Sequence, residues 1–572
     1  MIEAIYNLGK ILMQDDGNSG KVTPEPVSAD RLIIINLDKD GKLINVTDTK
    51  NVSEYEKKLL YKRVRASRRC NSCTPTFFLN IKEPQKSITC LKSIFNWMKN
   101  YNSSVKEPED YEAILKALKS YLKDFPPQSR EKILLTVTVD GNFPSEIPEI
   151  VSAFETGYVQ ELGFNEIGTC SLCGSTTRIT GKKSPFAFYT LNKVGYISGF
   201  SIKNHGKGFP ICFECFKKLE KAKQYISSKN FILTKNAPRY WLVPGVIFDT
   251  EISGSNSLKE LIENIYDLEY MKKYLHLTET EHQKLADTEE DILDILKELE
   301  DYLTFHFIFI EKNQSQEIIK LHIQDIYPSR IKKLFEAKTH VEKNLELKRE
   351  FTFGTLGQFF WKWDKHSKRK DLQKYFLDLI DRIFREVPFS EALLIKFLLN
   401  GIRRAYLDEE YDKLTALNAL ASFLFVKATT EGIMETIKTD DVRNLLETLP
   451  LLNTPEAKGL FVLGVLTQRL IDKQAGTRKG NKPFLKKLSS FKLDQRGFEK
   501  LMPELRDKME AYEIFGKFER ELFDLASECF AKANQPWKLN VEKMNFVFAV
   551  GMGMKDKIYN KKFENKTDGG KS

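Results

Sequence analysis

The sequence has few of the features that mark a membrane, secreted or disulfide-rich protein. Its longest apolar runs, residues 305–310 and 546–552, are far shorter than the roughly 20 residues that a membrane-spanning helix needs. Eight cysteines in 572 residues are too few for a disulfide framework. Residues 1–13 carry no basic leader and no cleavage site, so no signal peptide is predicted. These absences favour a soluble protein of the reducing cytoplasm, without a membrane partner.

Motifs of catalysis are also absent. None of the seven histidines lies in a His-Glu-x-x-His motif or a His-Asp pair, and the chain has no Gly-x-Ser-x-Gly motif. Segments 174–183 and 199–207 resemble phosphate-binding loops, but each has six residues where such a loop has four. We therefore predict a protein without catalytic residues. A metal-dependent nuclease built from dispersed carboxylates remains an alternative, because it would leave no local motif.

Composition indicates a large protein with an acidic partner. A chain of 572 residues with 41% hydrophobic residues is long enough for two to four domains with well-formed cores. The formal charge of +10 favours an acidic partner, but the excess is modest for this length. The distribution of the basic residues along the chain is therefore more informative than their total.

The strongest local pattern is a pair of Cys-x-x-Cys motifs with 38 residues between them. The four cysteines are Cys170, Cys173, Cys212 and Cys215. Four thiolates complete the tetrahedral shell of one structural zinc ion, and Gly174 can adopt the left-handed conformation of a tight turn. The alternatives are two disulfides, unrelated buried thiols or a redox motif, although a redox motif needs only one pair. Cys70, Cys73 and Cys90 lack a nearby histidine, so no second metal is predicted.

The segment between the two motifs is aromatic and basic. Residues 186–191 and 195–200 favour β-structure and are joined by 192–194, which predicts a hairpin, and a helix is predicted after Cys215. Between residues 168 and 218 the only acidic residue is Glu214. The basic residues there are Arg178, Lys182, Lys183, Lys193, Lys203, Lys207, Lys217 and Lys218. This charge predicts a surface that binds phosphate groups, and the alternative is a solvated basic face.

Two further basic clusters have the same two interpretations, a surface that binds phosphate groups or a solvated basic face. The N-terminal basic run, residues 57–69, contains Lys57, Lys58, Lys62, Arg63, Arg65, Arg68 and Arg69 and no acidic residue. The C-terminal basic loop, residues 469–492, contains a single acid, Asp472, and candidate contacts at Arg478, Lys479, Lys482, Lys486 and Lys487. Gly476 and Gly480 predict a flexible loop that could follow a single strand.

The predicted elements change in type along the chain. A helix over residues 1–13, a hairpin over 32–46 and a strand over 132–139 begin it, with helical segments within 91–122. Residues 231–248 favour strands, and 257–347 read as helical except for a strand over 303–310. Helices are predicted after residue 370 at 372–386, 390–406, 412–429, 455–473, 497–534 and 541–559.

The fold class that follows is α+β, with a mixed N-terminal body that carries a four-cysteine zinc module and an all-α helical bundle at the C-terminal end. The predicted domains are an N-terminal α/β body (1–167), the zinc module (168–222), the remainder of the N-terminal body (223–369) and the C-terminal bundle (370–572).

These motifs carry a family resemblance. The two cysteine motifs with the aromatic segment between them resemble the large subunit of type I-B CRISPR–Cas effector complexes, known as Cascade. Shorter stretches that fit the same family lie at residues 1–10, 240–244, 327–334 and 483–488. The resemblance extends over nearly the whole chain, and its most specific part is the double cysteine motif.

The resemblance implies a non-catalytic subunit of an antiviral surveillance complex. Such a subunit binds the 5′ region of the CRISPR guide RNA and double-stranded target DNA, including the displaced strand, and helps to recognise the motif flanking the target. It assembles with the Cascade backbone and small subunits and presents the opened DNA to a separate helicase–nuclease. Besides the nuclease, the remaining alternative is a stand-alone zinc-containing regulator that binds RNA or DNA.

Overall fold

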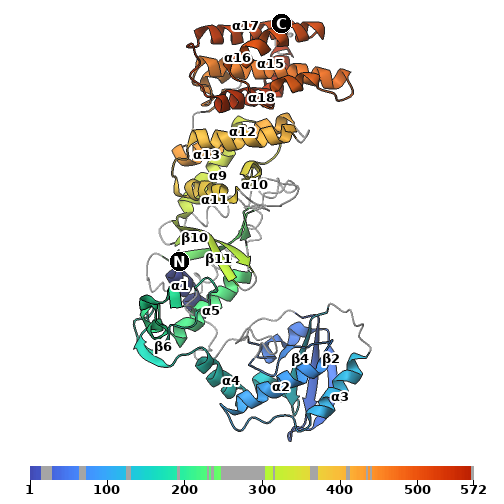
Figure 1. The fold of residues 1–572 in the computed structure, drawn as a ribbon, viewed down its shortest axis with the longest axis vertical. Helices are drawn as coiled ribbons and strands as arrows, with labels where there is room; N and C mark the ends of the chain where they lie inside the picture. The colour runs from blue at the N-terminus through green and yellow to red at the C-terminus, as the bar shows by residue number, and fades with distance from the viewer. Residues whose placement is uncertain are drawn as a thin grey trace. The chain divides into compact units, whose positions relative to one another are not determined.

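The computed structural model has the mixed α+β composition that the sequence predicts (Figure 1). It describes residues 1–13, 29–62, 73–123, 131–189, 194–228, 231–233, 237–246, 303–313, 316–360, 372–407, 412–432, 436–438 and 441–567. The chain forms two compact units. One comprises Ile2–Tyr225 with Gln314–Glu317, and the other comprises Ile226–Asn313 and Ile318–Ser572.

The first unit begins with helix α1 (Ile2–Met13), followed by a four-stranded sheet in the order β2-β1-β4-β3. The predicted hairpin is confirmed as β1 (Arg31–Leu37) and β2 (Leu43–Thr49), and the predicted strand as β4 (Ile133–Val139). β1 is antiparallel to β2 and parallel to β4, which is antiparallel to the short β3 (Phe77–Phe78). Because β1 and β4 are almost wholly buried, this pair forms the centre of the core.

Three helices accompany this sheet. They are α2 (Pro84–Lys99), α3 (Tyr111–Leu122) and α4 (Pro148–Glu161). The start of α3 is fixed by Asp110, whose carboxylate accepts hydrogen bonds from the backbone amides of Glu112 and Ala113. Ile88, Leu91 and Phe95 of α2 follow the three- and four-residue spacing of one helix face and are buried.

The second unit contains another four-stranded sheet, in the order β11-β10-β9-β8. Its strands are β8 (Phe231–Ile232), β9 (Arg239–Val246), β10 (Leu303–Asn313) and β11 (Gln316–Ile326). The prediction of helix over 257–347 is wrong for residues 316–326. Charged and apolar residues alternate there, and pairing with the buried β10 favours a strand over the helical propensity of single residues. Residues 247–302 lie outside the described ranges.

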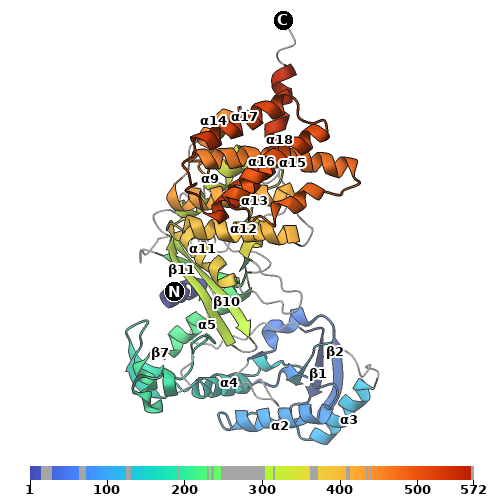
Figure 2. The same cartoon turned by 45° about the horizontal axis from the view of Figure 1, so that its top comes forward.

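The predicted C-terminal helices are confirmed (Figure 2). They are α11 (Gln373–Arg385), α12 (Glu391–Leu407), α13 (Lys413–Glu431), α15 (Pro455–Thr477), α16 (Gln495–Ala511), α17 (Lys517–Lys532) and α18 (Val541–Thr567). Two further helices are α9 (Pro328–Asn344), which lies in the predicted helical stretch 257–347, and the short α14 (Val442–Thr448), which the sequence does not predict. The hydroxyl of Thr454 accepts a hydrogen bond from the amide of Ala457, and Pro455 occupies the first turn, so α15 begins as its sequence predicts.

Helices α15 and α18 approach each other through glycines. A methyl group added at Gly551 of α18 would lie 2.0 Å from the carbonyl oxygen of Phe461 in α15. The reciprocal contact places a methyl group at Gly464 only 2.1 Å from the carbonyl oxygen of Phe548. Since these neighbours are backbone atoms, they cannot move without separating the helices.

Gly551→Ala is therefore expected to destabilise the C-terminal bundle by about 1–3 kcal/mol, the usual range for overpacking, despite the better helix propensity of alanine. The matched control is Gly476→Ala in α15, where no atom lies within 4 Å of the added methyl group. This control should stabilise the bundle by about 0.4–1 kcal/mol. Urea unfolding followed by far-UV circular dichroism measures both. Equal effects of the two variants would contradict the close contact.

Candidate metal centre and nucleic-acid interface

The first cysteine motif lies at the turn of a small antiparallel sheet. This sheet has the order β5-β6-β7, with β5 (Glu166–Thr169), β6 (Thr176–Thr180) and β7 (Ile211–Cys212). The turn between β5 and β6 is closed by a hydrogen bond of 3.0 Å from the amide of Gly174 to the carbonyl of Cys170. Gly174 has φ of 69°, the left-handed conformation expected from the sequence. This turn directs both thiols of the motif to one side.

The second motif joins the sheet to a helix. Cys212 ends β7, and Cys215 lies in the first turn of α5 (Phe213–Ser228), which confirms the helix predicted after this motif. The amide of Ser171 donates a 2.8 Å hydrogen bond to the carbonyl of Pro210, which ties the two motifs together. The N-terminal end of a helix also favours a thiolate, because the helix dipole is positive there.

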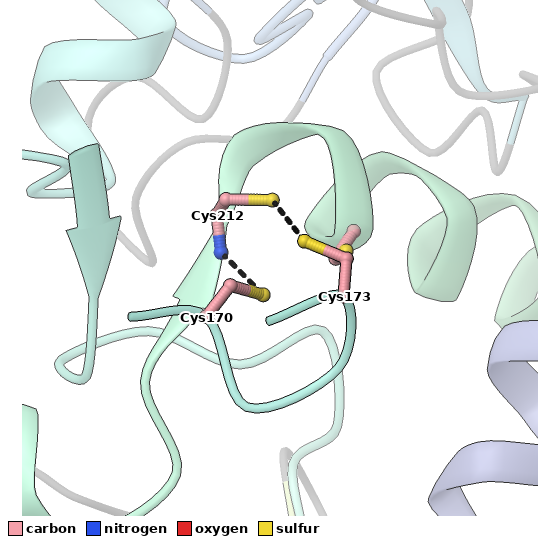
Figure 3. A group of neighbouring side chains, drawn as sticks. Cys170, Cys173 and Cys212 are labelled. Atoms are coloured by element: carbon pink, nitrogen blue, oxygen red, sulfur yellow. Dashed lines mark hydrogen bonds between the residues drawn. The ribbon is translucent and has the colours of Figure 1, made fainter. Parts of the chain in front are cut away.

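The four sulfur atoms converge on one point, and Figure 3 shows three of these residues, Cys170, Cys173 and Cys212. All Sγ atoms of Cys170, Cys173, Cys212 and Cys215 lie within 4.8 Å of one another, and the Cys173 and Cys212 sulfurs are 3.8 Å apart. A tetrahedral zinc site with bonds of about 2.3 Å has sulfur–sulfur edges of about 3.8 Å. The thiols are free, so the disulfide alternative is wrong for this set. The geometry and the soft donor set therefore fit a tetrahedral metal ion.

The electrostatics of the cluster also favour a cation. Burial raises the pKa of the Cys212 and Cys215 thiols, whereas hydrogen bonds from Ser175 lower the pKa of the exposed Cys173 to about 6. Two of the thiols are thus poor anions by themselves. A bound divalent cation would supply the positive charge that holds all four as thiolates.

The N-terminal helix covers the cluster, a feature that no sequence pattern predicts. Tyr6 of α1 forms a side-chain hydrogen bond with Cys215, and burial together with this bond raises the pKa of the tyrosine. A methyl group at Gly9 would lie 2.1 Å from the carbonyl oxygen of Lys218 in α5, so α1 and α5 are in close contact. Tyr6 is more than 200 residues from Cys215 along the chain, and no local pattern connects them.

The hairpin predicted between the motifs is wrong. Val194–Tyr196 and Ser198–Phe200 form the 3₁₀ turns η3 and η4, and Ile202–Lys207 forms η5. The aromatic residues before them pack instead: the Phe186 ring stacks on that of Phe188 with centroids 5.0 Å apart, and the ammonium of Lys223 in α5 lies 5.6 Å from the centre of the Phe186 ring. Tertiary packing beside α5 therefore buries Phe186, a side chain that the sequence assigned to a strand.

Comparison with protein-family models gives three matches that run in order along the chain. They are the N-terminal domain of CRISPR-associated protein TM1802 (cas_TM1802) at residues 1–156, its central domain at 167–326 and its C-terminal domain at 351–566. The chain belongs to the TM1802 family of CRISPR-associated proteins. A search of curated proteins finds no match to this sequence. The residues matched to the central domain include the four-cysteine cluster.

In this Cas protein the basic residues of the four-cysteine module (residues 168–222) lie largely at the surface. The exposed ones are Arg178, Lys182, Lys183, Lys203 and Lys207. Lys193 lies outside the described residues. Lys217 is buried and forms an ion pair of 2.9 Å with Glu214, the single acidic residue between residues 168 and 218. The free positive charge of the module is therefore carried by β6, η5 and the residues between β6 and η3.

Only the start of the N-terminal basic run is described, and Arg63, Arg65, Arg68 and Arg69 lie outside the described residues. The backbone of Lys57 lies within the 3₁₀ turn η1 (Val52–Lys58), and Lys58 forms an exposed ion pair of 3.1 Å with Glu146. The sequence places Lys62 on the nucleic-acid surface, but its side chain is 0% exposed and lies 2.6 Å from the Glu220 carboxylate of α5. Lys62 therefore belongs to the core, and we do not assign it to the nucleic-acid surface.

The C-terminal basic loop forms a turn after α15. Arg478, Lys479, Lys486 and Lys487 are exposed and Lys482 is half-buried. Gly476, predicted to lie in the loop, is still within α15. Lys479 and Gly480 have positive φ, and the amide of Gly480 donates to the carbonyl of Ala475 at 2.8 Å, so a defined turn follows the helix. The described turn thus orients most of its cations toward solvent.

Helices in the described part of the chain are too short or too polar to cross a membrane. Within the same residues, the four cysteines are the one cluster with the donors and spacing for a metal ion. Cys73 is a buried free thiol and Cys90 is disulfide-bonded, so these two do not provide a second thiolate pair.

Proposed function

We propose that this Cas protein is the non-catalytic large subunit of a type I-B Cascade, a CRISPR RNA-guided DNA surveillance complex of the cytoplasm. The observation that carries the proposal is the succession of three TM1802 family domains between residues 1 and 566. Its partners are the guide RNA, target double-stranded DNA with its displaced strand, the backbone and small subunits, and a helicase–nuclease. The subunit helps to recognise the motif that flanks the target.

The metal that we propose for the four cysteines is zinc, with a structural role. Four protein thiolates leave no open coordination position for a substrate or a water molecule, so the ion holds β5, β6, β7 and α5 together and takes no part in chemistry. Cys170, Cys173, Cys212 and Cys215 would each supply one sulfur. The residues around the cluster would then form a rigid base for the exposed lysines of the module.

The proposed contacts with nucleic acid are made through the backbone phosphates. In RNA-guided recognition, base pairing with the guide reads the target sequence, so the protein needs cationic surfaces and a small reader of the flanking motif. We assign these surfaces to the N-terminal basic run without Lys62, to the four-cysteine module and to the C-terminal basic loop. The residues are Lys57, Lys58, Arg63, Arg65, Arg68, Arg69, Lys182, Lys183, Lys193, Lys203, Lys207, Arg478, Lys479, Lys482, Lys486 and Lys487.

A cleavage assay separates this proposal from the nuclease alternative. The full chain is incubated with guide RNA, target DNA and Mg²⁺, both alone and with its partner subunits. The proposal expects binding and opening of the target without cleavage until the helicase–nuclease is added. Magnesium-dependent cleavage by the purified chain would overturn the non-catalytic assignment, and failure to join backbone subunits would favour the stand-alone regulator.

Charge reversal tests the N-terminal basic run. Replacing Arg63, Arg65, Arg68 and Arg69 by glutamate is expected to weaken binding of duplex DNA and to reduce the slope of log affinity against log salt. The reduction should be about 0.9 for each phosphate that the variant no longer neutralises, because fewer counterions are released. Affinity measured over a series of salt concentrations gives both values.

The control for this variant reverses four exposed lysines elsewhere in the same unit: Lys92, Lys116, Lys119 and Lys123. It changes the net charge by the same amount, so a general electrostatic effect would appear equally in both proteins. The proposal requires a larger reduction of the slope for the arginine variant. Equal slopes would assign the basic run to a solvated face.

A further inference from the structure

Two aromatic rings of the four-cysteine module project into solvent. Tyr196 at the end of η3 is 70% exposed, and Phe200 at the end of η4 is 76% exposed. Large aromatic side chains usually bury most of their surface, so exposure of two of them four residues apart is unusual. We infer that Tyr196 and Phe200 form a stacking platform for unpaired bases of single-stranded nucleic acid.

The backbone holds both rings in place. Ile197, between the two turns, is buried and anchors them, and the amide of Phe200 donates a 2.9 Å hydrogen bond to its carbonyl. The side-chain amide of Asn204 in η5 donates to the carbonyl of Ser198 at 2.9 Å. These bonds connect η4 to η5, which itself packs on the small sheet: a methyl group at Gly181 would lie 2.0 Å from the carbonyl oxygen of His205. The rings are therefore presented by a packed segment.

The backbone at Phe200 adopts a conformation that a bulky residue rarely takes. Its φ is 52°, directly after Gly199 with φ of 69°. The left-handed region disfavours a side chain with a Cβ atom, and such strain is concentrated at binding sites. In the extended region the Phe200 side chain would leave the backbone in another direction. The Phe200 ring thus combines a rarely adopted backbone conformation with a side chain that is mostly in solvent.

The charge around the rings identifies their ligand. Five exposed basic residues of the module are described, and the sequence has no acidic residue between residues 167 and 213. Two acidic side chains from outside this stretch lie against it, Glu166 beside Gly206 of η5 and Glu317, which accepts a hydrogen bond from the amide of Ala187. Lys203 and Lys207 lie on η5, the turn bonded to η4, and both are exposed. None of the five has an ion-pair partner within the described residues. Aromatic rings beside unpaired cations match the two chemical groups of a single strand, its bases and its phosphates.

This inference rests on the proposed function for its ligand source, because Cascade holds two single strands, the unpaired end of the guide RNA and the displaced DNA strand. A duplex offers no free base faces to Tyr196 and Phe200. A protein partner is a less suitable occupant, since the large exposed apolar side chains described here are few (the two rings, Val194 and Ile167) and lie among serine and lysine residues. The platform is therefore assigned to whichever strand has unpaired bases at this module.

The test compares oligonucleotides with and without bases. The full chain is titrated with fluorescent RNA and DNA strands of about ten nucleotides, within the site size typical of stacking proteins, and with abasic strands of equal charge. The wild-type chain should prefer the strand with bases. Tyr196→Ala with Phe200→Ala should lose that preference and bind about 5- to 150-fold more weakly for each stack removed, with an unchanged salt slope.

Three matched variants sharpen the result. Tyr196→Phe with Phe200→Tyr keeps both rings and should bind as the wild type does. Ile167→Ala removes an aliphatic side chain that is 81% exposed beside the same module and should have no effect. Lys203→Gln with Lys207→Gln should instead reduce the salt slope, by about 0.7 for each single-strand phosphate that is no longer neutralised. Far-UV circular dichroism and metal content confirm that each variant is folded.

The outcomes are distinct. A loss confined to RNA assigns the platform to the guide, and a loss confined to DNA assigns it to the displaced strand. No preference of the wild type for bases over abasic strands, or an unchanged affinity of the double alanine variant, would overturn the inference. A variant that fails only to join partner subunits would assign the rings to a protein contact and would also overturn it. A chain that stacks bases but never enters Cascade would contradict the proposed function alone.

Discussion

Replacing Cys212 by serine is expected to abolish metal binding and to unfold the four-cysteine module. The wild-type chain should contain one zinc ion and the variant none, as measured by elemental analysis after purification without chelators. The effect should be large, because structural zinc in small modules contributes about 10–16 kcal/mol of apparent binding free energy, which is also folding free energy. The sheet it stabilises is small: β7 has 2 residues, and most side chains of β5 and β6 are exposed.

Hydrogen exchange shows which segments unfold in the Cys212 variant. Amides of β5, β6 and the first turn of α5 should lose protection, whereas α15 and α18 in the other compact unit should keep theirs. The matched control is Cys529→Ser, which alters a free, buried thiol in α17 outside the cluster and should leave the metal content unchanged. A wild-type chain without metal, or a Cys212 variant that still binds it, would contradict the assignment.

The second large effect is expected at the buried ion pair between Lys62 and Glu220. The Lys62 ammonium is fully buried, 2.6 Å from the Glu220 carboxylate and 5.3 Å from the centre of the Tyr158 ring, and the Tyr158 hydroxyl donates to Glu220 at 3.1 Å. Glu220→Gln would remove the carboxylate that lies 2.6 Å from this buried cation. We expect a decrease of about 3–5 kcal/mol in the stability of this unit, since removing one partner of a buried ion pair is strongly destabilising.

The order of the stability losses of three variants tests this explanation. Lys62→Met should be less harmful than Glu220→Gln, because the Glu220 side chain is 16% exposed and retains Tyr158. Lys58→Met, the same substitution at the exposed pair with Glu146, should change stability by about 0–1 kcal/mol. Hydrogen exchange of α4 and α5 under native conditions measures the change in stability of each variant. Equal decreases at Lys58 and Lys62 would show that burial of the ion pair is not the cause.

Sequence alone determined the parts of this protein whose signals are local. The spacing of the two cysteine motifs predicted the four-cysteine cluster, and Gly174 predicted the turn between β5 and β6. Hydrophobic periodicity predicted the C-terminal helices, and two apolar, β-prone runs joined by the turn at residues 38–41 predicted the hairpin of β1 and β2. Each of these signals needs only a few neighbouring residues, because turns, helices and strands are selected by backbone conformation and by one buried face.

Tertiary structure decided the features that depend on distant contacts. Lys62 belongs by sequence to a basic run, but Glu220 lies 158 residues further along and takes it into the core. Residues 186–189 and 194–200 have strand propensity, but the Phe186 ring packs beside Lys223 of α5, and residues 194–200 form 3₁₀ turns with Tyr196 and Phe200 exposed. Tyr6 reaches Cys215 only because α1 packs on α5 at Gly9. Propensity is worth a few tenths of a kcal/mol per residue, and burial of a charge or a ring is worth several times more, so the distant contact prevails.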